Sequence, residues 1–260
     1  MPPILENTER RKRRDPQMRV WDRIVRIGHW LLAFAFATLY LQYKKFPLHP
    51  YAGYLVCAVV MFRIFWGFRG PGAARFSTFC FSPRAVFRYL GNALKGHAEY
   101  HFSHNPMGAA MVYALLALLL ANCLLGMLAY SASQQLGPFG AHVPDSWEET
   151  LVPIHAWLGH ATAVLVALHL AGVLWAARLH RENYILGMLS GVRRIPRAMP
   201  IPEGVTLVAS TAGNGLRQRT AGWLARHPML GSIVLMGAIV GITLPLIEAL
   251  VRLNRILPAY

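Results

Sequence analysis

The stretch EETLVPIHAWLGHATAVLVALHLAGVLWAARLHR, residues 148–181, decides the fold of this chain. Its apolar centre, residues 153–177, is long enough to cross the hydrocarbon core of a bilayer as one helix. His155 and His169 are fourteen residues apart, which places them about 40° apart around the helix and roughly 21 Å apart along it. His160 lies roughly 140° from His155, on another face. One membrane helix therefore presents two stacked imidazoles, and ionisable side chains inside a membrane mark function.

The composition is that of an integral membrane protein. Of the 260 residues, 55% are hydrophobic and only 14% are charged, which is too apolar for an ordinary soluble domain. A soluble bundle of buried helices would not need apolar segments as long and uninterrupted as these. Besides the stretch above, four segments approach the length that a bilayer requires, at residues 24–43, 50–68, 106–129 and 229–251. We therefore expect an all-α integral membrane fold with a four-helix transmembrane bundle and a fifth, C-terminal transmembrane helix.

The basic residues predict how the chain is oriented. The formal net charge is +15, and Lys and Arg gather before residue 27, between residues 69 and 105 and between residues 178 and 228. Residues 131–152 contain no Lys or Arg. By the positive-inside rule the three basic regions, including the N-terminus, are cytoplasmic, and the 131–152 loop faces the other side. Anionic headgroups explain the basic N-terminal run better than nucleic acid does, so membrane lipid is an expected partner and nucleic acid is not.

The direction of each span predicts which histidines meet. The first span runs outward and places His29 near the inner side, whereas the second begins outside with His49. The fourth span also begins outside, so His155 lies near the outer side and His169 lies deeper. The levels therefore match His29 with His169, and His49 with His155. Two imidazoles suit an iron porphyrin, whose flat apolar ring fits between helices, whereas Zn²⁺ takes four ligands.

Cysteine spacing and two further residues bear on the cofactor. The three cysteines show no CxxC or CxxCH spacing, which argues against a thiolate metal site and against covalent c-type haem. Gly53 permits a flat cofactor to approach the helix backbone closely. Arg63 follows His49 by fourteen residues, so it lies on nearly the same face and about 21 Å deeper. A charge there needs a partner, either a haem propionate or the inner headgroups.

Seven motifs together resemble one family, the bacterial cytochrome b561 / nickel-hydrogenase b-type cytochromes, over about residues 18–195. These motifs are VRIGHW, HPYAGY, RIFWGFRG, SHNPMGA, IHAWLGH, ALHLAGV and HRENYILGMLSGVRR. The resemblance implies a four-helix bundle with two b-type haems that passes electrons between a partner on the outer face and the quinone pool. It assigns the axial ligands to His29, His49, His155 and His169. The predicted fifth helix falls outside the resemblance.

On this basis the chain is expected to divide into four parts and to lie in the bacterial inner (cytoplasmic) membrane as a multi-pass protein with a cytoplasmic N-terminus. Residues 1–19 form a basic cytoplasmic arm, and residues 20–184 form the four-helix di-haem cytochrome b domain. Residues 185–228 form a cytoplasmic connection, and residues 229–260 form the C-terminal transmembrane helix and tail.

The expected function is that of a membrane di-haem b-type cytochrome. It would carry electrons between the quinone pool and a periplasmic redox protein such as a hydrogenase, a dehydrogenase or a cytochrome c. We expect an electron-transfer subunit of an oxidoreductase complex rather than an independent enzyme, and we assign no catalytic residue. Two alternatives remain open. One is a stand-alone superoxide:quinone oxidoreductase, for which Lys44 and Lys45 would attract the anion. The other, from a different class, is a His-lined metal-ion transporter.

Overall fold

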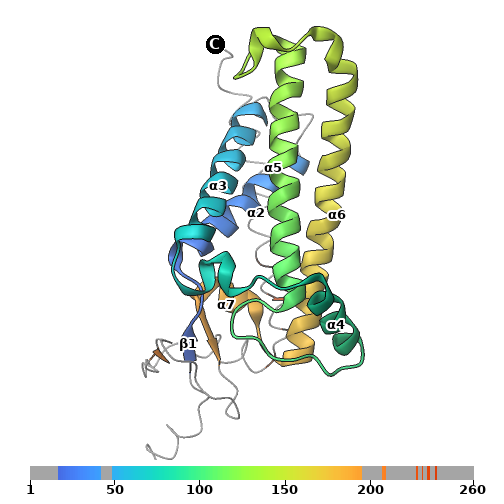
Figure 1. Ribbon diagram of the computed structural model, residues 1–260. Coiled ribbons are helices and arrows are strands. Elements are labelled where there is room, and N and C mark those ends of the chain that lie inside the picture. Colours follow the sequence, from blue (N-terminus) through green and yellow to red (C-terminus); the bar gives the residue numbers. More distant parts are fainter. Residues whose placement is uncertain are drawn as a thin grey trace, which may run out of the picture.

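Four long helices dominate the computed structural model (Figure 1). The structure describes residues 17–41 and 49–194, together with residues 207, 208, 227, 230, 233, 234 and 238. Four segments of this part of the chain are long and apolar enough to cross a membrane, and they form α2 (Arg23–Leu41), α3 (His49–Arg69), α5 (Pro106–Gln134) and α6 (Glu148–His180). The predicted mostly helical fold with four spans, typical of a multi-pass membrane protein, is confirmed.

Two of the spans are longer than the apolar pattern predicts. The pattern gives residues 106–129 for α5 and 153–177 for α6, but α5 continues to Gln134 and α6 begins at Glu148. The added turns contain polar residues that interrupt the continuous hydrophobic run. Glu148 and Glu149 nevertheless suit the first turn of a helix, where the helix dipole favours negative charge. The connection between α5 and α6 is correspondingly shorter than the predicted outer loop.

The helices pack in series, with α2 against α3, α3 against α5, and α5 against α6. Small and branched side chains form a buried cluster where α2, α3 and α5 meet, consisting of Ala35, Val56, Val60 and Leu116. Large apolar side chains cover the outside instead. Phe65 and Leu168, for example, are 55% and 57% exposed. Exposing so many apolar side chains to water would cost free energy, whereas lipid tails are as apolar as a protein core and solvate them without that cost.

Short elements gather at one end of the bundle, the end predicted to be cytoplasmic (Figure 1). α4 (Pro83–Leu94) and α7 (Tyr184–Ser190) lie there with a small antiparallel sheet. In this sheet β1 (Gln17–Arg19) pairs with β2 (Val192–Arg194) on one side and with β3 (Leu207–Val208) on the other. Strands of two or three residues carry too little alternation to be predicted. The remaining elements are the 3₁₀ turns η1 (Gly72–Ala74), η2 (Phe76–Thr78), η3 (Gly140–His142) and η4 (Asp145–Trp147).

The sheet joins two parts of the chain that the sequence analysis treats separately. Residues 17–19 end the predicted arm, whereas β2 and β3 belong to the predicted connection. Several predictions lie outside the described residues. These concern residues 1–16 of the arm, Lys44 and Lys45, most of the connection and nearly all of the fifth helix.

Arg193 is the buried centre of this end of the bundle, with only 3% of its surface exposed. It donates from Nε to Glu182 Oε1 at 2.8 Å and from Nη2 to Glu182 Oε2 at 2.6 Å. Its Nη1 donates to the carbonyl oxygens of His101, Phe102 and Ser103, at 3.2, 2.9 and 3.0 Å. Burial alone would lower the pKa of Arg193, but the hydrogen bonds and charge of Glu182 outweigh it and raise the pKa. One ionised side chain thus ties β2, the segment after α6 and the loop before α5 together.

Arg193→Met is expected to lower the free energy of unfolding by about 3–5 kcal/mol, because it leaves a buried carboxylate and three carbonyls without their donor. Denaturant or thermal unfolding in detergent measures the loss. Arg178 is exposed in the last turn of α6, so Arg178→Met should change stability by less than about 0.5 kcal/mol. Equal losses in the two variants would contradict a central role for Arg193.

Candidate functional site

Two histidine pairs lie at different depths of the bundle. His29 on α2 lies opposite His169 on α6, with ring centres 6.4 Å apart and 58° between the ring planes. His49 at the start of α3 lies opposite His155 on α6, with ring centres 6.1 Å apart and perpendicular planes. These are the pairs that the helix directions predict. Because α6 rises about 1.5 Å per residue, the two pairs are separated by roughly 21 Å along it.

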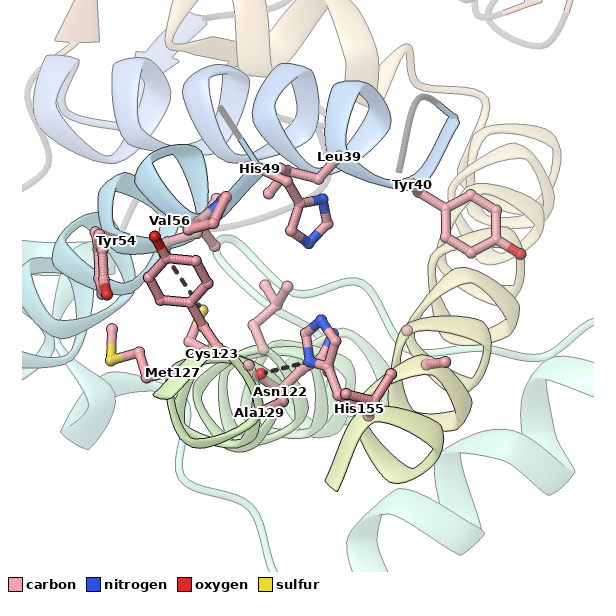
Figure 2. Close-up of a pocket in the computed structure, with 18 of the residues that line it drawn as sticks. Leu39, Tyr40, His49, Tyr54, Val56, Asn122, Cys123, Met127, Ala129 and His155 are labelled. Atoms are coloured by element: carbon pink, nitrogen blue, oxygen red, sulfur yellow. Dashed lines mark hydrogen bonds between the residues drawn. The ribbon is translucent and has the colours of Figure 1, made fainter. Parts of the chain in front are cut away.

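The outer pair, His49 and His155, is oriented by a backbone carbonyl. His155 Nδ1 lies 3.1 Å from the carbonyl oxygen of Asn122 on α5. A carbonyl can only accept, so Nδ1 carries the proton and Nε2 of the neutral ring keeps a free lone pair. Figure 2 shows the His49 and His155 rings pointing toward each other across a cavity. A carbonyl that fixes the tautomer and the ring direction is the usual second partner of a metal-binding histidine.

A cavity of about 400 Å³ surrounds the outer pair. All four spans line it, and most of the lining side chains are apolar, among them Phe36, Leu39, Val56, Leu119 and Met127. Gly53 also lines the cavity, and a Cβ placed on it would meet no protein atom within 4 Å. A Cβ on Gly126, in contrast, would lie 2.8 Å from Cε1 of His155. The volume and the lining are those of a site for a largely apolar ligand.

The inner pair, His29 and His169, contains polar atoms that lack partners. Among the described residues, Nδ1 of His29 and Nε1 of the adjacent Trp30 are buried and make no hydrogen bond. Their two rings lie edge to face with centres 5.0 Å apart. Buried polar atoms are costly unless they are hydrogen-bonded or bound to another group. The inner pair therefore needs a polar or metal-containing group to complete it.

Arg63 lies on α3 at the depth of the inner pair, since it follows His49 by fourteen residues just as His169 follows His155. Its guanidinium carbon lies 5.1 Å from the centre of the Phe76 ring. Nη1 of Arg63 is buried and finds no hydrogen-bond partner in the part of the chain that the structure describes. The Asp22 carboxylate interacts electrostatically with Arg63. Nη1 still has room for a second anionic group between the helices.

His104 is a buried residue that the sequence analysis did not select as a site residue. It precedes α5, and its ring centre lies 4.7 Å from that of Trp21 and 4.1 Å from that of Phe79. Burial, followed by the positive charges of Arg63 and Arg193, lowers the pKa of His104 to about 3. The ring is therefore neutral. The motif SHNPMGA contains His104, but nothing in its spacing indicates burial, because the neighbouring rings come from the segment before α2 and from the loop after α3.

Side chains rather than backbone bridge α2 and α6. The hydroxyl of Tyr40 and Nδ1 of His160 lie 3.0 Å apart, which agrees with the placing of His160 on a different face from His155. Extensive backbone contact between these two helices is absent from residues 17–41 and 49–194. Within the same ranges, no three His, Cys, Asp or Glu side chains form a group able to hold a metal ion. At each of the two depths, the candidate ligands are therefore the two imidazoles of one histidine pair.

Comparison with known proteins agrees with the resemblance that the motifs indicate. A family model described as prokaryotic cytochrome b561 matches residues 20–191, a range that contains both histidine pairs. No curated protein and no solved structure matches the chain. The predicted family is confirmed, and membership of it implies b-type haem.

The paired histidines fit such a group. Two imidazoles on one iron would place their ring centres roughly 6.3 Å apart, because a metal–imidazole bond is about 2.0–2.1 Å long and each ring centre lies about 1.1 Å behind the bonding nitrogen. The observed separations are 6.4 Å and 6.1 Å. Nδ1 of His29 and Nδ1 of His49 are buried and lack a hydrogen-bond partner among the residues described. The chemistry of the donors and their spacing both suit axial ligation of iron.

Gly126→Ala is expected to disturb the outer pair selectively, because the added Cβ would push the His155 ring out of position. We expect the haem bound per chain to fall to about half of the parent value, measured by pyridine haemochrome assay against protein concentration. Gly91 lies on α4, where a Cβ would meet nothing within 4 Å, so Gly91→Ala is the matched control. Full haem content in the Gly126 variant, with an unchanged spectrum, would contradict this geometry.

Proposed function

The chain belongs to the prokaryotic cytochrome b561 family, and from this we propose that it carries electrons across a membrane on two b-type haems. Family membership supports electron transfer by a membrane b-type cytochrome. We assign one haem to His29 with His169 and the other to His49 with His155. The observation that carries this assignment is the separation of the paired rings, 6.4 Å and 6.1 Å.

Three roles are proposed for the residues around each haem: they place it between the helices, they orient it, and they shield it from water. When bound, a b-type haem would supply reversible one-electron chemistry, and the two imidazoles of each pair would hold its iron. The Asn122 carbonyl holds the His155 ring so that its free nitrogen can face the cavity. The apolar lining of the cavity excludes water, which tunes the redox potential through the local dielectric.

Gly53 and Arg63 are proposed to contact the haems without ligating iron. Gly53 leaves the cavity wall open where a side chain would project, so the edge of a flat ring can approach the backbone of α3. Nη1 of Arg63, which has no hydrogen-bond partner among the described residues, would pair with a propionate of the inner haem. A positive charge beside the haem favours the reduced state, because reduction adds a negative charge to the site.

We propose that the protein lies in the bacterial inner membrane with its N-terminus in the cytoplasm. The loop between α3 and α5 is basic, whereas residues 135–147 contain no Lys or Arg, and this asymmetry supports the orientation. Asp145, Glu148 and Glu149 are exposed at the opposite end, together with Trp147, which is 52% exposed. An acidic surface with an exposed aromatic ring suits a periplasmic redox partner such as a hydrogenase, a dehydrogenase or a cytochrome c.

The electron acceptor or donor within the membrane is proposed to be quinone, and the chain is proposed to act as a subunit of an oxidoreductase complex. The superoxide alternative relies on Lys44 and Lys45, which lie outside the described residues, and it stays a prediction. No group of three or more His, Cys, Asp or Glu side chains able to hold a metal ion occurs among the described residues, so nothing there favours the metal-ion transport alternative. The fifth helix also remains a prediction.

Purified protein is expected to show a b-type reduced-minus-oxidised spectrum and about two haems per chain. His169→Ala and His155→Ala should each remove about one haem, because each deletes one axial ligand of a different pair. His160 lies on the same helix but is hydrogen-bonded to Tyr40, so His160→Gln should retain both haems. Two haems in either alanine variant would overturn the ligand assignment.

A short-chain quinol is expected to reduce the cytochrome in detergent. Stopped-flow absorption at the α-band of the b-type haem measures the rate of this reduction. If electrons pass through both haems, His169→Ala should slow reduction of the remaining haem at least roughly tenfold, a barrier increase of about 1.4 kcal/mol. Dithionite reduction of both proteins is the control. Reduction by dithionite but not by quinol would disprove the quinone proposal and leave the haem assignment intact.

A further inference from the structure

Helix α4, Pro83–Leu94, is an independent, well-terminated helix in the loop between α3 and α5. Ser82 caps it by accepting a hydrogen bond from the Ala85 backbone N–H at 3.3 Å, and Pro83 occupies its first turn. Gly96 follows it with a φ of +79°, a left-handed conformation that glycine adopts without strain and that ends helices. The ends of α4 are therefore set by its own residues.

One side of α4 is attached to the bundle. Tyr89 and Ala93 are buried, and the helix packs against α5. The Tyr89 hydroxyl lies 3.1 Å from Nε2 of His180 at the end of α6. These contacts fix the rotation of α4 about its own axis.

That rotation turns two other rows of side chains away from the bundle. Phe87 and Leu94 are 72% and 62% exposed and lie about 20° apart around the helix. Arg84 and Arg88, with Lys95 at the helix end, are also exposed and project about 60–100° to one side of Phe87. An apolar row beside a basic row is the pattern of a helix that lies in the headgroup region of a membrane.

The basic row is not explained by the stability of the helix. Arg84 lies in the first turn, where the helix dipole disfavours positive charge, and that turn contains no acidic residue. The sequence from residue 69 to residue 98 contains no Asp or Glu, and Glu99 is the one acidic residue in the loop between α3 and α5. One carboxylate is too few to neutralise the three cations of α4. Three exposed cations next to two exposed apolar side chains thus require an anionic partner that also offers an apolar surface.

We propose that α4 is a docking site for anionic phospholipid of the leaflet at this end of the bundle. Phe87 and Leu94 enter the acyl-chain boundary, and Arg84, Arg88 and Lys95 bind the lipid phosphates. Attachment to α5 and α6 holds the helix at the depth of the headgroups. This inference does not depend on haem or quinone, because it concerns a surface outside the histidine pairs.

The test is native mass spectrometry of the full-length protein, purified in detergent and equilibrated with equal amounts of phosphatidylglycerol and phosphatidylcholine. We expect the parent protein to retain phosphatidylglycerol preferentially. The triple variant R84Q/R88Q/K95Q should retain at least roughly tenfold less phosphatidylglycerol than the parent protein. The matched control is R69Q/R178Q/R181Q, which removes three exposed arginines elsewhere on the chain and should keep the preference. Equal losses in both triple variants would show a net-charge effect and overturn the proposal.

Hydrogen exchange supplies a second measurement that does not rely on charge. Amides of residues 83–94 should exchange more slowly in phosphatidylglycerol vesicles than in phosphatidylcholine vesicles, and F87S/L94S should abolish the difference. Unfolding temperatures verify that both sets of variants fold. Equal exchange in the two vesicle types would overturn the proposal, and protection that appears only with a soluble protein present would assign the surface to that protein instead.

Discussion

The gap between paired imidazole rings is the constraint on which this bundle depends. At 6.1–6.4 Å between centres, the rings are too far apart to hydrogen-bond to each other and too close to admit another side chain. Polar atoms left unsatisfied in hydrocarbon cost several kcal/mol each. α6 meets α2 and α3 through these rings, so a group that bridges them also holds the helices together. The proposed haems would therefore contribute to the stability of the fold as well as to electron transfer.

The two ends of the bundle differ in how they are held together. At the inner end, the buried Arg193–Glu182 pair, the small sheet and α4 connect segments that are far apart in the sequence. At the outer end, the short connection between α5 and α6 carries exposed acidic side chains and one exposed tryptophan. A cross-linked inner end can hold the helices in register, whereas the opposite end carries exposed charged side chains.

The apolar pattern predicted the spans well where hydrophobic residues continue to the helix ends. α2 and α3 begin within one residue of their predicted starts, at Arg23 and His49. The pattern failed at the polar turns of α5 and α6 and at the short strands, because neither contributes enough periodic signal. His104 was missed for another reason. Its burial depends on Trp21 and Phe79, which no local pattern connects to it.

The sequence by itself predicted the four described spans and the histidines of different helices that share a level. A helix has a constant rise and rotation per residue, so spacing along the chain converts directly into depth and facing. Only the tertiary structure decided that the Asn122 carbonyl orients His155 and that Arg193 holds three carbonyls of a distant loop. These features arise from contacts between side chains and backbone of different helices, and no helical repeat encodes such contacts.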